Sequence, residues 1–226
     1  MFLQIINMLF QGFAVTLSLF AITIVFAVPL GLPIALGSRS RFRAVRYVVR
    51  AFVWVIRSTP LMLQVLAVSF IPSVVFHIMN KDVAAAFGVS VSQLNFIFVA
   101  AAFIINYACY FSEIYRAGIA AVSKGQYEAG KVLGLTKAQT FRKVVLLQVI
   151  KHIVPPMGNE IITLVKDTSL AQILGVIDLL SAAQNAVNSL VVLSPLIYAA
   201  VFYLIFNGLL TLLLGYTEKK LGYFRV

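Results

Sequence analysis

The chain has 226 residues, of which 62% are hydrophobic and only 11% charged, with one cysteine and a formal net charge of +11. Soluble domains average roughly a quarter charged residues, so this composition argues against a soluble enzyme or a nucleic-acid-binding domain and favours an all-α integral membrane protein. A single cysteine excludes an internal disulfide and any multi-cysteine metal site.

Four stretches with at most one charged residue are long enough to cross a bilayer, which takes a helix of about 20 residues. The predicted spans are residues 12–37, 61–79, 94–115 and 191–215. Between the first two, an arginine-bearing helix is predicted over residues 42–56, and its basic and aromatic side chains suit a membrane surface with acidic headgroups. Phe96, Phe98 and Phe103 of the third stretch are expected to face lipid.

Positive charge gathers on alternate connections. Nearly all lysines and arginines fall within residues 39–57, 116–151 and 219–225, whereas the connection around Lys81 and Asp82 holds few charges. The positive-inside rule places the basic connections on the cytoplasmic side of a cell (inner) membrane. The N-terminus is then outside and the C-terminus cytoplasmic, an arrangement that requires an odd number of spans, about five.

The remaining span is expected at residues 152–165. This stretch is short, and its interruptions are Pro155, Pro156 and Gly158. Such breaks are tolerated where neighbouring helices satisfy the freed backbone groups, and a re-entrant segment is the alternative interpretation. We expect an outer connection with Asp167 and Asp178 to follow, and the whole chain, residues 1–226, to form one domain.

The long cytoplasmic connection, between the third and fourth spans, contains a regular segment at about residues 123–148. Ser123 and Thr136 each begin a capping-box pattern, in which a hydroxyl and an amide satisfy the free N–H groups of a helix start. Gly134 stands where the first helix needs a left-handed residue to end. The pattern predicts a helix–turn–helix that docks into a groove of another protein.

The same segment resembles the EAA loop of ABC importer permeases. The matching residues are Glu128, Ala129, Gly130, Gly134 and Phe141. Residues 57–61 and 166–170 resemble the R-G-T-P-L and K-D-T-S-L elements of the polar amino-acid permease branch. Ser58, Gly130 and Leu147 depart from the family pattern, and Leu147, where a proline is common, favours a straighter second helix.

The resemblance implies a permease subunit of an ATP-driven importer of polar amino acids, with no catalysis of its own. Two permease subunits, identical or homologous, would form the pathway, two cytoplasmic ATPases would bind the EAA loops, and an extracytoplasmic binding protein would deliver the substrate. No cofactor is then expected on this chain, since ATP and Mg²⁺ belong to the ATPases. The chain has no G-x-x-x-x-G-K-[ST] loop, which fits this division of labour.

Several polar residues at membrane depth are candidates for the substrate pathway. They are Asn106, Tyr110, Glu113, Glu160, Lys166, Asp167, Thr168 and Ser169. Ionisable groups in a membrane are costly and either mark a pathway or pair with one another. The first three recur at i, i+4 and i+7 and therefore share one helix face.

A polar amino acid presents a carboxylate and an ammonium group, so its site needs a cationic and an anionic end. Lys166 and the N–H groups near Thr168 and Ser169 are candidates for the carboxylate, and the acidic residues of the set for the ammonium group. Alternatively, Lys166 and Asp167 neutralise each other at a helix end. The excess of acidic groups favours a basic or neutral substrate.

Two other functions fit parts of the sequence. A secondary transporter or channel would be favoured by an inverted internal repeat, and the sequence has none that is visible. A membrane anchor that recruits a soluble enzyme would explain the cytoplasmic segment but not the ionisable residues at membrane depth.

Overall fold

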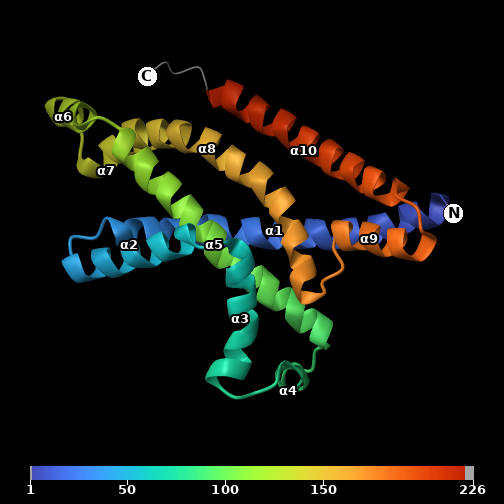
Figure 1. Ribbon diagram of the computed structural model, residues 1–226. Coiled ribbons are helices and arrows are strands. Elements are labelled where there is room, and N and C mark those ends of the chain that lie inside the picture. Colours follow the sequence, from blue (N-terminus) through green and yellow to red (C-terminus); the bar gives the residue numbers. More distant parts are fainter. Residues whose placement is uncertain (1, 222–226) are drawn as a thin grey trace.

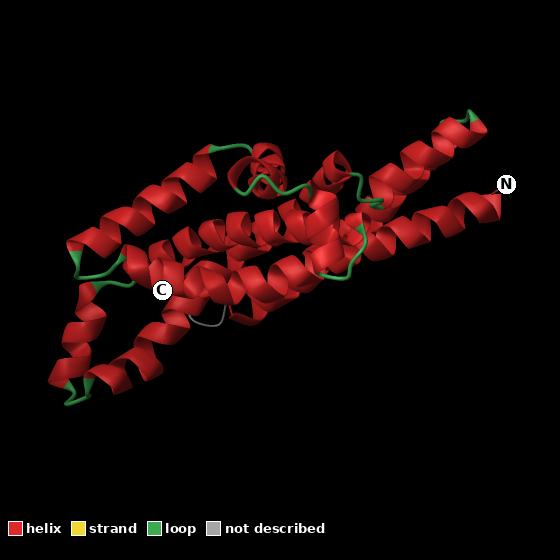
Figure 2. Ribbon diagram, turned by 90° about the horizontal axis from the view of Figure 1, so that it is seen from below, coloured by secondary structure: helices red, strands yellow, loops and turns green. Residues whose placement is uncertain are grey.

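The structure, a computed structural model, describes residues 2–221, which form helices joined by short connections, with no strand among them (Figure 1, Figure 2). In chain order the elements are α1 (Phe2–Ser38), α2 (Arg43–Ser58), α3 (Leu61–Val75), α4 (Asn80–Ala86), α5 (Val91–Ala121), α6 (Lys124–Val132), α7 (Lys137–Thr140), the π-helix η1 (Phe141–Val145), α8 (Leu146–Asp167), the 3-10 helix η2 (Thr168–Leu174), α9 (Leu179–Leu190) and α10 (Ser194–Leu221). The all-α prediction is confirmed.

Three helices are long and apolar enough to cross a membrane alone: α1, α5 and α10. Two bent pairs bring the number to as many as five. One is α2 with α3, which meet at 112°, and the other is Lys137–Leu174 with α9, which meet at 56°. The prediction of about five spans agrees with this upper number.

A stripe of small residues on α1 lets other helices approach it closely. Its buried positions include Gly12, Thr16, Ala27 and Gly31, and α5 and α9 pack against it. At Gly31 an added Cβ would lie 2.9 Å from the Cβ of Phe111, so the α1–α5 contact depends on the missing side chain. Small residues serve the same purpose in membrane helix packing generally.

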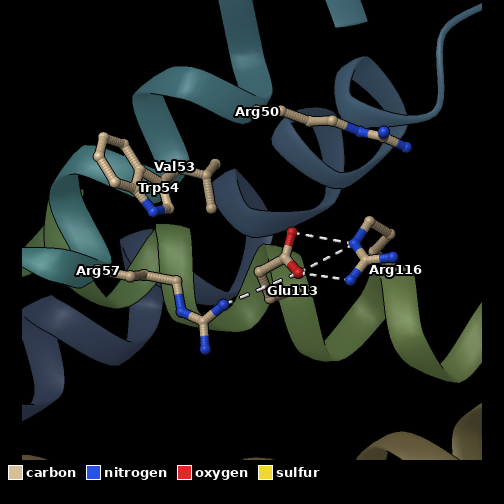
Figure 3. A pocket seen from close by; sticks show the side chains of 6 residues that line it. All are labelled: Arg50, Val53, Trp54, Arg57, Glu113 and Arg116. Carbon is tan, nitrogen blue, oxygen red and sulfur yellow. Dashed lines mark hydrogen bonds and ion pairs between the residues drawn. The ribbon is translucent and has the colours of Figure 1, made fainter. Parts of the chain in front are cut away.

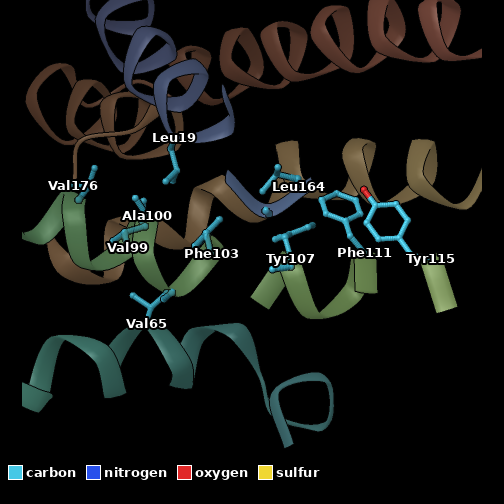
Figure 4. Close-up of a cluster of buried hydrophobic side chains, with 14 of the residues drawn as sticks. Leu19, Val65, Val99, Ala100, Phe103, Tyr107, Phe111, Tyr115, Leu164 and Val176 are labelled. Atoms are coloured by element: carbon cyan, nitrogen blue, oxygen red, sulfur yellow. The ribbon is translucent and has the colours of Figure 1, made fainter. Parts of the chain in front are cut away.

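α5 forms the centre of the largest hydrophobic core, where it crosses α1 and contacts α3 and α8 (Figure 1, Figure 4). Phe103 is fully buried in this core beside Leu19 of α1 and Leu164 of α8. The prediction that Phe103 faces lipid is therefore wrong, whereas Phe96 and Phe98 are partly exposed. An apolar helix in a membrane has no polar face from which its packed side could be recognised.

The fourth span is not broken where we predicted. α8 is helical without interruption through Pro155, Pro156 and Gly158. Each proline removes one backbone donor, but Ile153 and Met157 anchor this part of α8 in the core. The chain turns instead beyond Asp167, through η2 and Gly175, and enters α9.

Asp167 and Asp178 belong to helix ends that flank the predicted outer connection, and the place of this connection outside the membrane stays a prediction. Asp167 is the last residue of α8, and Asp178 is the N-cap of α9. The Asp178 side chain accepts hydrogen bonds from the backbone N–H groups of Leu180 and Ser181 at 3.2 and 3.0 Å. A buried acidic residue here starts a helix.

Candidate functional site

A cavity of about 530 Å³ lies between the start of α3, the middle of α5 and the second half of α8. Its lining residues are Thr59, Pro60, Leu61, Met62, Asn106, Tyr107, Tyr110, Glu160, Thr163, Asp167 and Leu170. We call it the central cavity. Its two carboxylates, from Glu160 and Asp167, are seven residues apart and so occupy one face of α8.

Hydrogen bonds hold the polar side chains of the central cavity in place. The Tyr107 hydroxyl donates to Oδ2 of Asp167 at 2.7 Å, which joins α5 to α8. Asn106 donates from Nδ2 to Oε1 of Gln64 at 2.9 Å. Gln64 in turn donates from Nε2 to the carbonyl of Ile56 at 2.6 Å, so the bend between α2 and α3 is tied to α5.

A second cavity, of about 410 Å³, adjoins the first, because Tyr110 and Glu160 line both. Arg57 also lines it, and its guanidinium lies 5.0 Å from the centre of the Tyr110 ring. Such a contact is a cation–π interaction. A cationic group therefore shares this second cavity with Glu160, whereas Asp167 lines only the central cavity.

Glu113 is held by arginines from two helices (Figure 3). Arg116 donates to both of its carboxylate oxygens, from Nε at 3.0 Å and from Nη2 at 2.7 Å. Arg57 makes a longer ion pair with it at 3.8 Å. Of the predicted pathway residues, Glu113 is thus the one already neutralised within the chain.

The structure brings together five predicted pathway residues and leaves out the other three. Asn106, Tyr110, Glu113, Glu160 and Asp167 line the two adjoining cavities.

Lys166 is exposed and lines neither cavity. The alternative interpretation, an ion pair between Lys166 and Asp167, is not found in the described chain, in which Glu113 makes the ion pairs. Thr168 and Ser169 donate their hydroxyls to the carbonyls of Val165 and Lys166. Because α8 continues directly into η2, Thr168 already donates its backbone N–H within the helix, so no free helix start is available there for a carboxylate.

Sequence reasoning missed four residues that line or support these cavities: Arg57, Gln64, Tyr107 and Thr163. Arg57 begins the 57–61 element noted in the sequence, but the sequence does not show that it lies beside Glu160, because more than 100 residues separate the two. A signal was available for Tyr107, because it follows Asn106 directly in a mostly apolar stretch, and the polar face noted around Asn106 could have included it.

The predicted EAA segment begins with a short helix that packs on the start of a long one. Gly134 has φ of +70°, and the N–H of Leu135 donates to the carbonyl of Gly130 at 2.9 Å. The capping box at Thr136 is present, whereas the Ser123 side chain accepts no capping hydrogen bond. The second predicted helix is not separate, since α7 continues through η1 into α8.

Within this segment the candidate coupling residues occupy two environments. Glu128, Ala129 and Gly134 are exposed, and Phe141 is 42% exposed. Gly130 is buried against Thr140. Two further apolar side chains project from the same turn: Val132 is 87% and Leu133 76% exposed.

The chain is similar to known transport proteins. Residues 27–223 match the family described as "Binding-protein-dependent transport system inner membrane component". The L-cystine transport system permease protein of Bacillus subtilis is 35% identical over 212 residues, which cover 93% of this chain and 85% of that protein. The arginine transport system permease protein of the same organism is 32% identical over 218 residues, covering 96% and 93% of the two chains.

A solved structure has the same fold. A chain from the crystal structure of an amino acid ABC transporter with histidines superposes with a TM-score of 0.81 at 30% identity, covering 97% of this chain and 96% of its own length. The three apolar helices and two bent pairs fit a protein that crosses the inner membrane several times. The chain belongs to the family of inner membrane components of binding-protein-dependent transport systems.

Proposed function

We propose that this chain is the permease subunit of an ATP-driven importer of basic or neutral polar amino acids. The family implies an ATPase, a binding protein and a second permease subunit as partners. Relatives named for L-cystine and arginine transport, and a structural neighbour described as an amino acid transporter, support the substrate class. A partner permease, identical or homologous, would complete the pathway.

The observation that carries the proposal is the charge of the central cavity. Glu160 and Asp167 line it, and no lysine or arginine of residues 2–221 does so. Neither carboxylate makes an ion pair in the described chain, and a carboxylate without an ion-pair partner is costly in a membrane. The ammonium group or basic side chain of an amino acid supplies that partner, whereas an acidic side chain adds a third negative charge.

The substrate carboxylate needs a positive group a short distance away. Arg57 fills this role better than Lys166, because Arg57 lines the adjoining cavity together with Glu160 and Tyr110. A guanidinium also matches a carboxylate in a two-pronged hydrogen bond. An α-amino acid would then span the two cavities, with its amino group toward Glu160 and Asp167.

The EAA segment would couple ATP hydrolysis by the partner ATPase to transport through this chain. We place the ATPase contact at Glu128, Ala129, Gly134 and Phe141, with Gly130 holding α6 on Thr140. The chain itself would bind no cofactor, and ATP and Mg²⁺ would bind the ATPase. The N-terminus would lie outside and the C-terminus in the cytoplasm, in keeping with the basic residues of the segment between α5 and α8.

The test is ATP-driven uptake of labelled arginine and glutamine by proteoliposomes that hold this chain, its ATPase and its binding protein. Asp167→Asn and Glu160→Gln each remove a charge-assisted interaction worth about 1.5–3 kcal/mol, so kcat/KM for arginine should fall at least about tenfold. Lys166→Gln, a charge change one residue from Asp167 but on an exposed side chain, is the matched control.

Three results would count against the proposal. Unchanged arginine uptake by both carboxylate variants would remove the central cavity from the pathway. A loss as large in Lys166→Gln would show that charge near α8, and not the cavity, matters. Uptake without ATP by the chain alone would favour a secondary transporter.

A further inference from the structure

Three arginines converge where α2 meets α5. They line a cavity of about 330 Å³, whose residues are Arg50, Val53, Trp54, Arg57, Glu113 and Arg116 (Figure 3). We call it the arginine pocket. The α2 residues come from three successive turns, and Glu113 and Arg116 face them from one turn of α5.

The arginine pocket carries an unbalanced positive charge. Its single carboxylate, Glu113, contacts Arg116 at 2.7 Å and Arg57 at 3.8 Å. No carboxylate of residues 2–221 pairs with Arg50, whose Nε donates to the carbonyl of Ser38 at 3.1 Å. Three guanidinium groups against one carboxylate leave two positive charges, and the singly charged phosphodiester of a phospholipid would balance one of them.

The position of the pocket points to a membrane lipid as the source of this phosphate. α2 follows α1, a membrane-spanning helix, after a short turn and bends by 112° into α3. The exposed aromatic rings of Tyr47 and Trp54 on α2 are typical of the membrane–water interface. Anionic headgroups are concentrated at that depth, and basic pockets between membrane helices bind them.

We propose that the arginine pocket binds the phosphate of an anionic phospholipid, with Arg50 and Arg116 as the main ligands and Trp54 beside the lipid. The planar fork of arginine matches phosphate oxygens geometrically. This site goes beyond the proposed function and does not depend on which solute the chain transports.

The chain provides its own reporter for a test, since Trp54 is its only tryptophan and is 69% exposed. The full-length chain is reconstituted in phosphatidylcholine vesicles that contain phosphatidylglycerol, and one lipid or the other carries bromine on its acyl chains. Bromine near Trp54 quenches its fluorescence. One arginine at a membrane surface contributes about fivefold in binding to an anionic lipid, so brominated phosphatidylglycerol should be preferred at Trp54 by at least that factor.

Three variants separate the pocket from general surface charge. Arg50→Gln should lower the preference about fivefold. Glu113→Gln should raise it, because Arg57 and Arg116 lose their competing carboxylate. Arg43→Gln, the control, removes the same charge from α2 seven residues, or roughly 10 Å along the helix, before Arg50. This distance exceeds the Debye length of about 8 Å, so the preference should stay unchanged.

Circular dichroism of each variant would check that the helices are retained, and the gain expected from Glu113→Gln does not depend on how well Arg50→Gln folds. The proposal fails if the wild type shows no preference for phosphatidylglycerol. It also fails if Arg43→Gln loses as much preference as Arg50→Gln. Relief of the quenching by millimolar inorganic phosphate would assign the pocket to a free anion and overturn the lipid site.

Discussion

Gly130 offers the sharpest test of how the EAA segment is built. An ideal Cβ at this position would lie 2.5 Å from Oγ1, 2.6 Å from Cγ2 and 3.1 Å from Cβ of Thr140. Carbon atoms in favourable contact are about 3.5–4.0 Å apart, so Gly130→Ala must push α6 away from α7 by about 1 Å. Overpacking of this size costs about 1–3 kcal/mol.

The cost should appear as weaker binding of the ATPase. If α6 and α7 must keep their present spacing in the docked complex, 1–3 kcal/mol corresponds to a dissociation constant raised at least about fivefold. The assay is titration of the reconstituted permease with purified ATPase, beside ATP-driven uptake. Membrane insertion and the thermal unfolding temperature should change little, because α6 contacts only α7 and η1 extensively.

A second substitution makes the reasoning refutable. Thr140→Ala removes the two closest atoms and leaves Cβ at 3.1 Å. Alone it should cost about 1 kcal/mol, the worth of the hydrogen bond from its hydroxyl to the carbonyl of Thr136. The double variant Gly130→Ala with Thr140→Ala should therefore bind the ATPase better than Gly130→Ala alone. Strictly additive losses, or normal binding by Gly130→Ala, would refute the steric argument.

Three further predictions concern other parts of the chain. Gly134→Ala should destabilise the fold of the EAA segment by about 1 kcal/mol, because φ is +70° while the space around an added Cβ is open. Gly134→Asn should cost less. Equal losses of ATPase affinity in the two variants would contradict this. Tyr107→Phe removes the hydrogen bond to Asp167 and should change the KM for arginine severalfold at unchanged ATPase binding; an unaltered KM would separate Tyr107 from the substrate. Gly12→Ala would place a Cβ 2.7 Å from the Asp178 carbonyl oxygen and should lower stability in detergent by about 1–3 kcal/mol. Gly208→Ala, in open space, should have little effect. Equal unfolding temperatures of the two variants would contradict this prediction.

Composition and charge predicted the membrane class and the approximate number of spans, because both follow directly from the physics of a bilayer. Local chemistry predicted the left-handed Gly134 and the capping box at Thr136, since both depend only on neighbouring residues. Pro155 and Pro156 misled us because the cost of a proline is local, whereas the packing of Ile153 and Met157 that offsets it is not.

The candidate site shows the same limit of prediction from sequence, because residues near in sequence were predictable and distant ones were not. Glu160 and Asp167 were predictable as a pair, because seven residues of one helix fix their common face. The positive group near Glu160 was not, since Lys166 lies next to Asp167 in sequence but is exposed, while Arg57 lines the adjoining cavity with Glu160 from more than 100 residues away.

What brings Arg57 there is the bend of 112° between α2 and α3. Ser58 and Thr59 end one helix and Pro60 precedes the next, and Gln64 ties the bend back to Ile56 and across to Asn106. A change in this bend would move Arg57 relative to both Glu113 and Glu160. The bend therefore links the cavity that Arg57 lines with Glu160 to the arginine pocket, and a substitution such as Gln64→Leu should disturb both uptake and lipid preference while Lys166→Gln disturbs neither.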